Sequence, residues 1–181
     1  GLTEIGFNQA RAMAKEISAR NPDILISSPM KRTIETANEI ANLTGLEIIE
    51  DKHWIESGFG EWDELTVEEI MKLYPQEWQS WVSDTSYAPG KTGESFESVS
   101  ARTEHALSTI EADYVGKTIV VVTHHMVIKT IVANVLSAPL VSMFHLDVAP
   151  CGITTVNSWP SDGLRALKSL SERSFQNTFK F

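Results

Sequence analysis

Two adjacent histidines, His124 and His125, follow a run of five β-branched residues at positions 118–122. Such a run, without polar alternation, is typical of a strand that is covered on both faces inside a parallel sheet. In open α/β sheets, the groups that contact a ligand lie just beyond the carboxyl ends of the strands. His124 falls at that position, so we expect it to be functional. The alternative is a hydrogen-bonded histidine at the rim of the core.

Two more polar groups follow an earlier predicted strand, residues 23–29, which ends in Ser27 and Ser28. Arg32 comes next, in the first turn of the following predicted helix. A planar guanidinium and the free N–H groups of a helix N-terminus can bind the same phosphate. Ser28 and Arg32 are therefore candidate anion-binding residues.

A carboxyl group comes from the loop after the next predicted strand, residues 46–51. This loop, residues 53–65, is dense in aromatic, acidic and glycine residues and contains Glu56. Loops often carry functional side chains on a rigid scaffold. An arginine, a carboxyl group and a histidine on separate strand ends are a minimum set for handling a phosphoryl group. They supply charge neutralisation, proton transfer, and a nucleophile or oxyanion partner.

The rest of the chain must position these groups. Helical spacing of apolar residues predicts helices at 3–20, 30–43, 66–84 (two short helices broken at Pro75), 94–114 and 126–136. Three further strands are predicted at 145–149, 153–158 and 164–170. The alternation of strands and helices predicts an α/β fold with three layers, in which helices flank a mostly parallel sheet.

Composition narrows the class of protein. The 181 residues, 42% of them apolar, fit one domain over 1–181 with a sizeable core, and the net charge of −9 argues against a nucleic-acid surface. No apolar run is long enough to span a membrane, and the first residues lack a secretion-signal pattern. A single cysteine excludes an internal disulfide and favours a cytoplasmic setting. No ligand cluster has metal spacing, so we expect neither metal nor cofactor.

Several conspicuous residues have plainer interpretations. Trp78 and Trp81, three residues apart, are expected to pack in the core or at its rim rather than to form a ligand platform. The turn-rich residues 85–93 either form a lid or simply connect two helices. Cys151 lies beside Pro150 and Gly152 with nothing to activate it, so packing is expected rather than nucleophilic chemistry.

Five stretches of this sequence resemble motifs of the histidine phosphatase superfamily, also called phosphoglycerate mutase-like, in the family's order. They are LTEIGFNQA, SSPMKRTIETA, IESGFGEWDELT, GESFESVSAR and VVVTHHMVIKT, and together they extend over nearly the whole chain. The resemblance implies that Arg32 binds phosphate and that Glu56 donates a proton to the leaving oxygen. It also implies that His124 is the second active-site histidine, which hydrogen-bonds the transferring group.

Other positions match the family less closely. Glu94, Ser95 and Arg102 fit a further family motif, and we interpret them first as residues that cap and support a helix. His125 stands where relatives usually have glycine, so it either narrows the pocket, adds a hydrogen-bond donor, or is only structural. The family's Trp-Glu-Gly is replaced by residues 62–64, Trp-Asp-Glu. If Glu64 pointed inward, it would weaken phosphate binding.

The family's nucleophile has no counterpart in this sequence. It is the histidine of an Arg-His-Gly motif on the first strand, shortly before the LT-x-x-G segment, and here Gly1 directly precedes that segment. The other histidines, His53, His105, His125 and His145, lie in unsuitable places. Loss of a central strand would leave the backbone groups of two neighbouring strands unpaired. We therefore expect the domain to be N-terminally incomplete as given, and inactive in that form.

The resemblance implies a phosphatase that hydrolyses a small phosphate monoester through a phosphohistidine, without a cofactor. A phosphoglycerate mutase and a non-catalytic phosphate-binding or scaffold module are the alternatives. The last third, from FHLDVAP onward, is similar to the phosphatase half of actinobacterial proteins that join a ribonuclease H domain to an α-ribazole-phosphatase-like domain. A fused upstream domain is therefore possible. The expected partner is a small phosphorylated metabolite, not nucleic acid or membrane, and the oligomeric state stays open.

Overall fold

Three short strands form a parallel sheet in the computed structural model, which describes residues 1–173. They are β1 (Ile24–Ser27), β2 (Ile48–Glu50) and β3 (Ile119–Val122), in the spatial order β2-β1-β3. A separate antiparallel pair is formed by β4 (Ile153–Trp159) and β5 (Leu164–Glu172). The strands of the parallel sheet all end at the same edge, which is what brings distant residues together.

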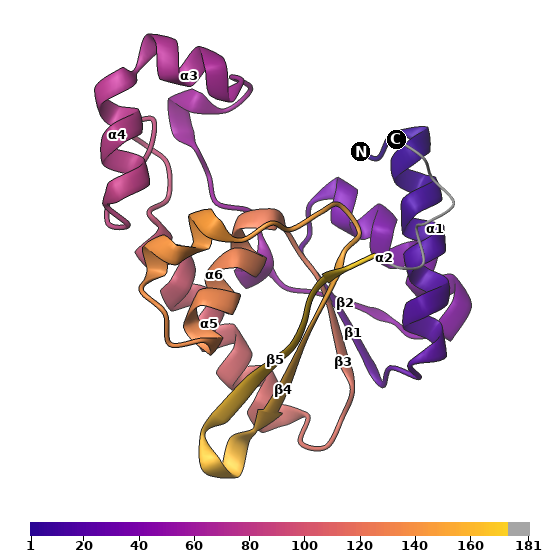
Figure 1. Ribbon diagram of the computed structural model, residues 1–181. Coiled ribbons are helices and arrows are strands. Elements are labelled where there is room, and N and C mark those ends of the chain that lie inside the picture. Colours follow the sequence, from indigo (N-terminus) through magenta and orange to yellow (C-terminus); the bar gives the residue numbers. More distant parts are fainter. Residues whose placement is uncertain (174–181) are drawn as a thin grey trace.

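Helices cover both faces of the parallel sheet, which confirms the predicted three-layer α/β fold (Figure 1). One face carries α1 (Glu4–Ala19) and α2 (Lys31–Thr44), and the other carries α5 (Phe96–Asp113) and α6 (His125–Val135). The remaining helical segments are α3 (Val67–Leu73), α4 (Pro75–Ser83), η1 (Lys52–Trp54), η2 (Gly60–Trp62), η3 (Leu140–His145) and η4 (Pro160–Asp162). Among residues 1–173, each helix is too short or too polar to cross a bilayer.

The strands divide their side chains between the two helical layers. Leu25 and Val120 belong to the apolar cluster built with α1 and α2, whereas Ile26 and Val121 belong to the cluster built with α5 and α6. Successive strand residues point to opposite faces, so a strand covered on both sides must be apolar at every position. This accounts for the uninterrupted β-branched run of β3.

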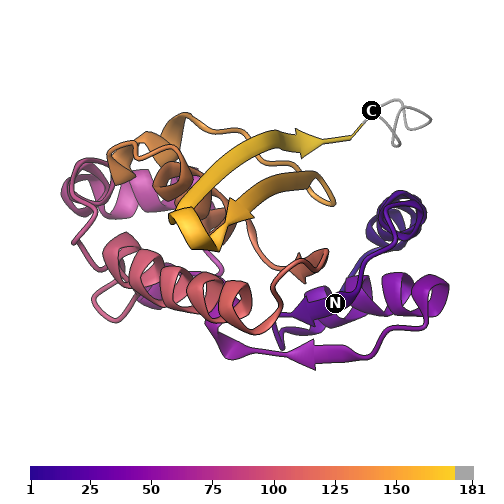
Figure 2. The same cartoon turned by 90° about the horizontal axis from the view of Figure 1, so that it is seen from below.

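The free edge of β3 is the main difference from the expected central strand. Within residues 1–173, β3 pairs on one side only, with β1, and the β4–β5 pair forms its own sheet (Figure 2). All four residues of β3 are half-buried rather than buried. Helices therefore cover the faces of β3, while its second row of backbone groups is left without a strand partner among the described residues.

One of the three predicted late strands is wrong. Residues 145–149 were expected to form a strand, but His145 ends η3 and the next residues are irregular. Met143, fully buried in the aromatic cluster, requires the tight turn of η3. The Ala149 amide then donates to the side-chain hydroxyl of Ser171 in β5 at 2.8 Å, not to a backbone carbonyl as in a strand pair. The other two strands are confirmed as β4 and β5.

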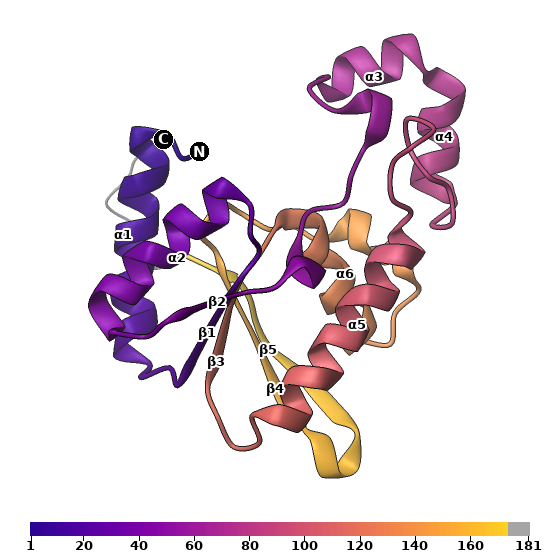
Figure 3. The same cartoon turned by 180° about the vertical axis from the view of Figure 1, so that it is seen from behind.

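The helices α3 and α4 stand beyond the carboxyl edge of the sheet, and α4 contacts the start of α5 and η3 (Figure 3). Pro75 begins α4, as the sequence predicts. Trp81 is buried, with ring centroids 5.3 Å from Phe96 and 5.1 Å from Phe144 and Trp78. The prediction that the two tryptophans pack rather than form a ligand platform is confirmed.

Candidate active site

The ends of β1 and β3 lie side by side and place the first candidate residues together. Ser27 is in register with Val122, and the Ser28 amide donates to the Val122 carbonyl at 2.9 Å. The chain after each strand therefore leaves the sheet at the same point. Ser28 is fully buried there and His124 is 5% exposed.

His124 is held through both ring nitrogens. Its Nδ1 lies 2.9 Å from Nη2 of Arg32, and its Nε2 lies 2.8 Å from the hydroxyl of Ser28. A guanidinium can only donate, so Nδ1 must accept and the ring proton sits on Nε2, which donates to Ser28. Burial, followed by the positive charges of Arg32 and Arg102, lowers the pKa of His124 from 6.5 to about 4. The imidazole is therefore neutral at pH 7 in the free protein.

Two helix N-termini point at this pair. Arg32 lies in the first turn of α2, and His124 is the N-cap residue of α6. The first N–H groups of a helix lack partners within the helix and carry partial positive charge. An anion placed between Arg32 and His124 would meet a guanidinium together with both helix ends, as expected from the sequence.

Glu56 reaches the same place from the loop after η1. One carboxyl oxygen accepts from the amide of Ser57 at 2.9 Å, and the other lies 3.5 Å from the amide of Met126 in the first turn of α6. Burial raises the pKa of Glu56, while the two amides, Arg32 and Arg102 oppose the rise. A carboxyl with a raised pKa keeps its proton to higher pH, which is what a proton donor requires.

His125 follows His124 directly in the chain. It is exposed at the start of α6, and its neighbours are Lys129, one helical turn on, and Asp147. Burial and Lys129 lower the pKa of His125, while Asp147 opposes them. The sequence did not single out Lys129 or Asp147, and a contact between His125 and substrate stays a prediction.

Arg102 was interpreted from the sequence as a helix-supporting residue, and this interpretation missed its contacts. Ser95 caps α5 by accepting from the Ser98 amide, as expected. Arg102 forms an ion pair with Glu94. It also donates to the backbone carbonyls of His53 and Ile55, outside its own helix. Only the ion pair could have been predicted from the sequence, because Glu94 lies about two helical turns before Arg102.

The structure also places the remaining residues that the sequence singled out. Burial raises the pKa of Cys151 to about 11, so its thiol stays protonated at neutral pH. Glu64 is exposed. Residues 85–93 are fastened to the Glu56 loop, since the Glu61 amide donates to the Gly90 carbonyl at 3.0 Å. In residues 1–173, no group of three or more His, Cys, Asp or Glu side chains is arranged to hold a metal ion.

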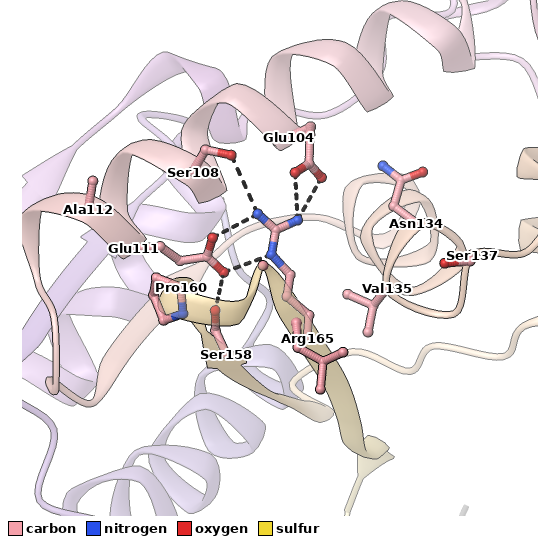
Figure 4. Close-up of a pocket in the computed structure, with 12 residues that line it drawn as sticks. Glu104, Ser108, Glu111, Ala112, Asn134, Val135, Ser137, Ser158, Pro160 and Arg165 are labelled. Carbon is pink, nitrogen blue, oxygen red and sulfur yellow. Dashed lines mark hydrogen bonds and ion pairs between the residues drawn. The ribbon is translucent and has the colours of Figure 1, made fainter.

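A hollow of about 530 Å³ lies elsewhere, between α5, the end of α6 and the β4–β5 hairpin (Figure 4). Its charged residues already pair with one another: Arg165 binds both oxygens of Glu104 at 2.6 and 2.8 Å, and both oxygens of Glu111 at 2.7 and 2.8 Å. The hollow is at the hairpin end of the molecule, remote from the carboxyl ends of the parallel strands. We assign it to the attachment of the hairpin, not to the chemistry.

Comparison with known proteins identifies the family. The sequence profile of the Histidine phosphatase superfamily (branch 1) matches residues 1–170. The chain belongs to the histidine phosphatase superfamily. A solved histidine phosphatase-like neighbour, phosphoserine phosphatase of Entamoeba histolytica in complex with 3-phosphoglyceric acid, is 28% identical with a TM-score of 0.86, over 96% of this chain and 85% of that one.

Two curated relatives resemble this histidine phosphatase domain in sequence. Phosphoserine phosphatase 1 of Hydrogenobacter thermophilus is 35% identical over 139 residues, which is 77% of this chain and 66% of the relative. A bifunctional protein of Mycobacterium tuberculosis is 30% identical over 178 residues, which is 97% of this chain and 48% of the relative. The chain therefore spans about half to two thirds of the length of these relatives.

Proposed function

We propose that this domain is a phosphatase that hydrolyses a small phosphate monoester through a phosphohistidine intermediate. The observation that carries the proposal is the 2.9 Å contact between Arg32 and His124, between two helix N-termini and beside the half-buried carboxyl of Glu56. These three groups supply anion binding, a polarising imidazole and a proton donor. Membership of the histidine phosphatase superfamily and the phosphatase names of its relatives support it.

Binding of phosphate would change the partners of His124. A phosphate oxygen is a better acceptor for Arg32 than Nδ1 of a neutral ring, so the guanidinium moves its hydrogen bond to the ligand. Nδ1 is then free, and the nearby negative charge raises the pKa of His124. The ring takes up a proton and donates to the phosphate, while Ser28 keeps Nε2 in place. Phosphate binding is thereby coupled to proton uptake.

The nucleophile in this proposal is a histidine on a further strand that pairs with the free edge of β3. The support is the β-branched run of β3 and its pairing on one side only within the described residues. That histidine forms the N–P bond as the P–O bond to the alcohol breaks, and Glu56 gives its proton to the departing oxygen. Water then attacks phosphorus, the N–P bond breaks, and Glu56 takes the proton from water.

The proposal extends to the substrate, the cellular location and a fused domain. We expect a small phosphorylated metabolite as substrate, and a cytoplasmic location from the single cysteine, Cys151. Relatives are named for phosphoserine, which carries a carboxylate as well as a phosphate. A fused upstream domain of the ribonuclease H type would be consistent with the 48% coverage of the mycobacterial bifunctional relative.

Two proteins test the proposal: residues 1–181 alone, and the same chain extended by the segment encoded upstream in the gene. Phosphate release from p-nitrophenyl phosphate is expected only from the extended protein, and His124→Ala and Glu56→Gln should each abolish most of it. Conversion of 3- to 2-phosphoglycerate at a higher rate than hydrolysis would make the domain a mutase. Phosphate binding without turnover in the extended protein would make it a binding module. Steady turnover by residues 1–181 would show that the nucleophile lies within the chain described.

A further inference from the structure

The Arg102 side chain reaches from α5 into the Glu56 loop and binds backbone carbonyls there, in addition to its ion pair with Glu94. Its Nη1 donates to the carbonyl of His53 at 2.5 Å, and its Nη2 donates to the carbonyl of Ile55 at 2.8 Å. The Ile55 carbonyl belongs to the peptide bond between Ile55 and Glu56. The Arg102 side chain is 16% exposed, so it lies largely out of water.

Glu94 fixes the orientation of the guanidinium and holds the other end of the same loop. Its carboxylate accepts from Nε of Arg102 at 2.8 Å and from Nη2 at 2.9 Å, and also from the hydroxyl of Ser98. Its own amide donates to the carbonyl of Gly58 at 2.8 Å, and its carbonyl accepts from the hydroxyl of Ser57 at 3.3 Å. The loop is therefore bound immediately before and immediately after Glu56.

We propose that Arg102, oriented by Glu94, is a positioning residue: it holds the backbone carbonyls of His53 and Ile55, just before Glu56, and so aims the Glu56 carboxyl at the Arg32–His124 pair. The reason is geometric: a five-donor planar fork spans two carbonyls and one carboxylate at once, which a lysine cannot do. That this orientation serves proton donation by Glu56 rests on the proposed function. The hydrogen bonds from Arg102 to the loop are seen in the structure independently of that function.

The same guanidinium contributes charge to the site. The groups that act on the Glu56 carboxyl are Arg32 from α2 and Arg102 from α5, together with the amides of Ser57 and Met126. Both arginines lower the pKa of Glu56 against the effect of burial. Removal of Arg102 should therefore leave a loop that is looser and a carboxyl that titrates at higher pH.

The test uses residues 1–181 and two readouts that do not depend on turnover: amide hydrogen exchange at positions 54–57, and the ¹³C titration of the Glu56 carboxyl, assigned with Glu56→Gln. In Arg102→Met we expect exchange at 54–57 to quicken about tenfold or more, because two carbonyls lose their donors, and the Glu56 midpoint to rise. Arg102→Lys keeps the charge and loses the fork, so exchange should still quicken while the midpoint moves less.

Arg165→Met is the matched control, because Arg165 also joins α5 to another segment through two carboxylates but lies at the hairpin end. It should change neither readout. Wild-type exchange and midpoint in Arg102→Met would overturn the proposal, as would quickening spread evenly over the domain. If Arg102→Met does not fold, Arg102→Lys decides by exchange alone: quickening confined to positions 54–57 supports the proposal, and wild-type exchange overturns it.

A kinetic readout on the extended protein separates this inference from the proposed function. If Glu56 is the acid, the rate falls as pH rises through its pKa, and Arg102→Met should lower kcat more than it raises KM and move that alkaline limb upward. A structural role alone would lower the rate equally at every pH. An extended protein without activity whose loop still loosens as described would refute the phosphatase and leave the positioning role intact.

Discussion

Acid should weaken this fold through His124, and replacing that residue should remove the effect. The pKa of His124 is about 4 in the folded protein and 6.5 for the unperturbed ring. Protonating His124 therefore costs about 3 kcal/mol more in the folded chain than in the unfolded chain. As pH falls, the unfolded chain takes up the proton first. The contribution of the neutral ring to the free energy of unfolding is therefore fully present above pH 6.5. It is lost progressively as pH falls from 6.5 to 4, and it is absent below pH 4.

The assay is urea unfolding between pH 7 and pH 4, followed by tryptophan fluorescence, for wild type and His124→Asn. Asparagine keeps an acceptor for Arg32 and removes the titrating ring. The free energy of unfolding should fall by about 3 kcal/mol less in the variant than in wild type over this range. Arg32→Met should show part of the same change, because burial, the larger cause, remains. Equal pH dependence in wild type and His124→Asn would refute the neutral, Arg32-bound imidazole.

Three further predictions follow from the site and its surroundings. Glu56→Gln should raise the free energy of unfolding at pH 7 but not at pH 4, because burial raises the pKa of Glu56 and its charged form is unfavourable in the fold; urea unfolding at both pH values checks this. Arg32→Ala should weaken inorganic phosphate binding about tenfold or more by calorimetry, whereas unchanged affinity would place the anion elsewhere. Arg165→Ala should cost about 2 kcal/mol of stability, because it leaves Glu111 without its partner, while phosphate affinity stays at the wild-type value.

Much of the fold followed from local pattern. The strand at the β-branched run of β3 and the start of α4 at Pro75 are each decided by the conformational preferences of single residues, so the sequence predicts them well. The convergence of Arg32 and His124 also followed, because parallel strands must end at one edge.

What the sequence could not show depends on contacts between distant segments. The predicted strand at 145–149 failed because Met143 is buried by a turn against aromatic residues from α4 and α5, which no local pattern records. The hold of Arg102 on the carbonyls of His53 and Ile55 was missed for a related reason. Backbone carbonyls carry no sequence signal, so an arginine that binds them looks like any other helix residue.

The central claim is that Arg32, Glu56 and His124 bind one phosphate, and phosphate titration followed by NMR of the His124 ring tests it most directly. Saturating phosphate should raise the pKa of His124 well above its value of about 4 and shift the Nδ1 resonance as Arg32 releases it. Arg32→Met should abolish that response. A His124 ring whose pKa and Nδ1 resonance stay unchanged at saturating phosphate would contradict the account.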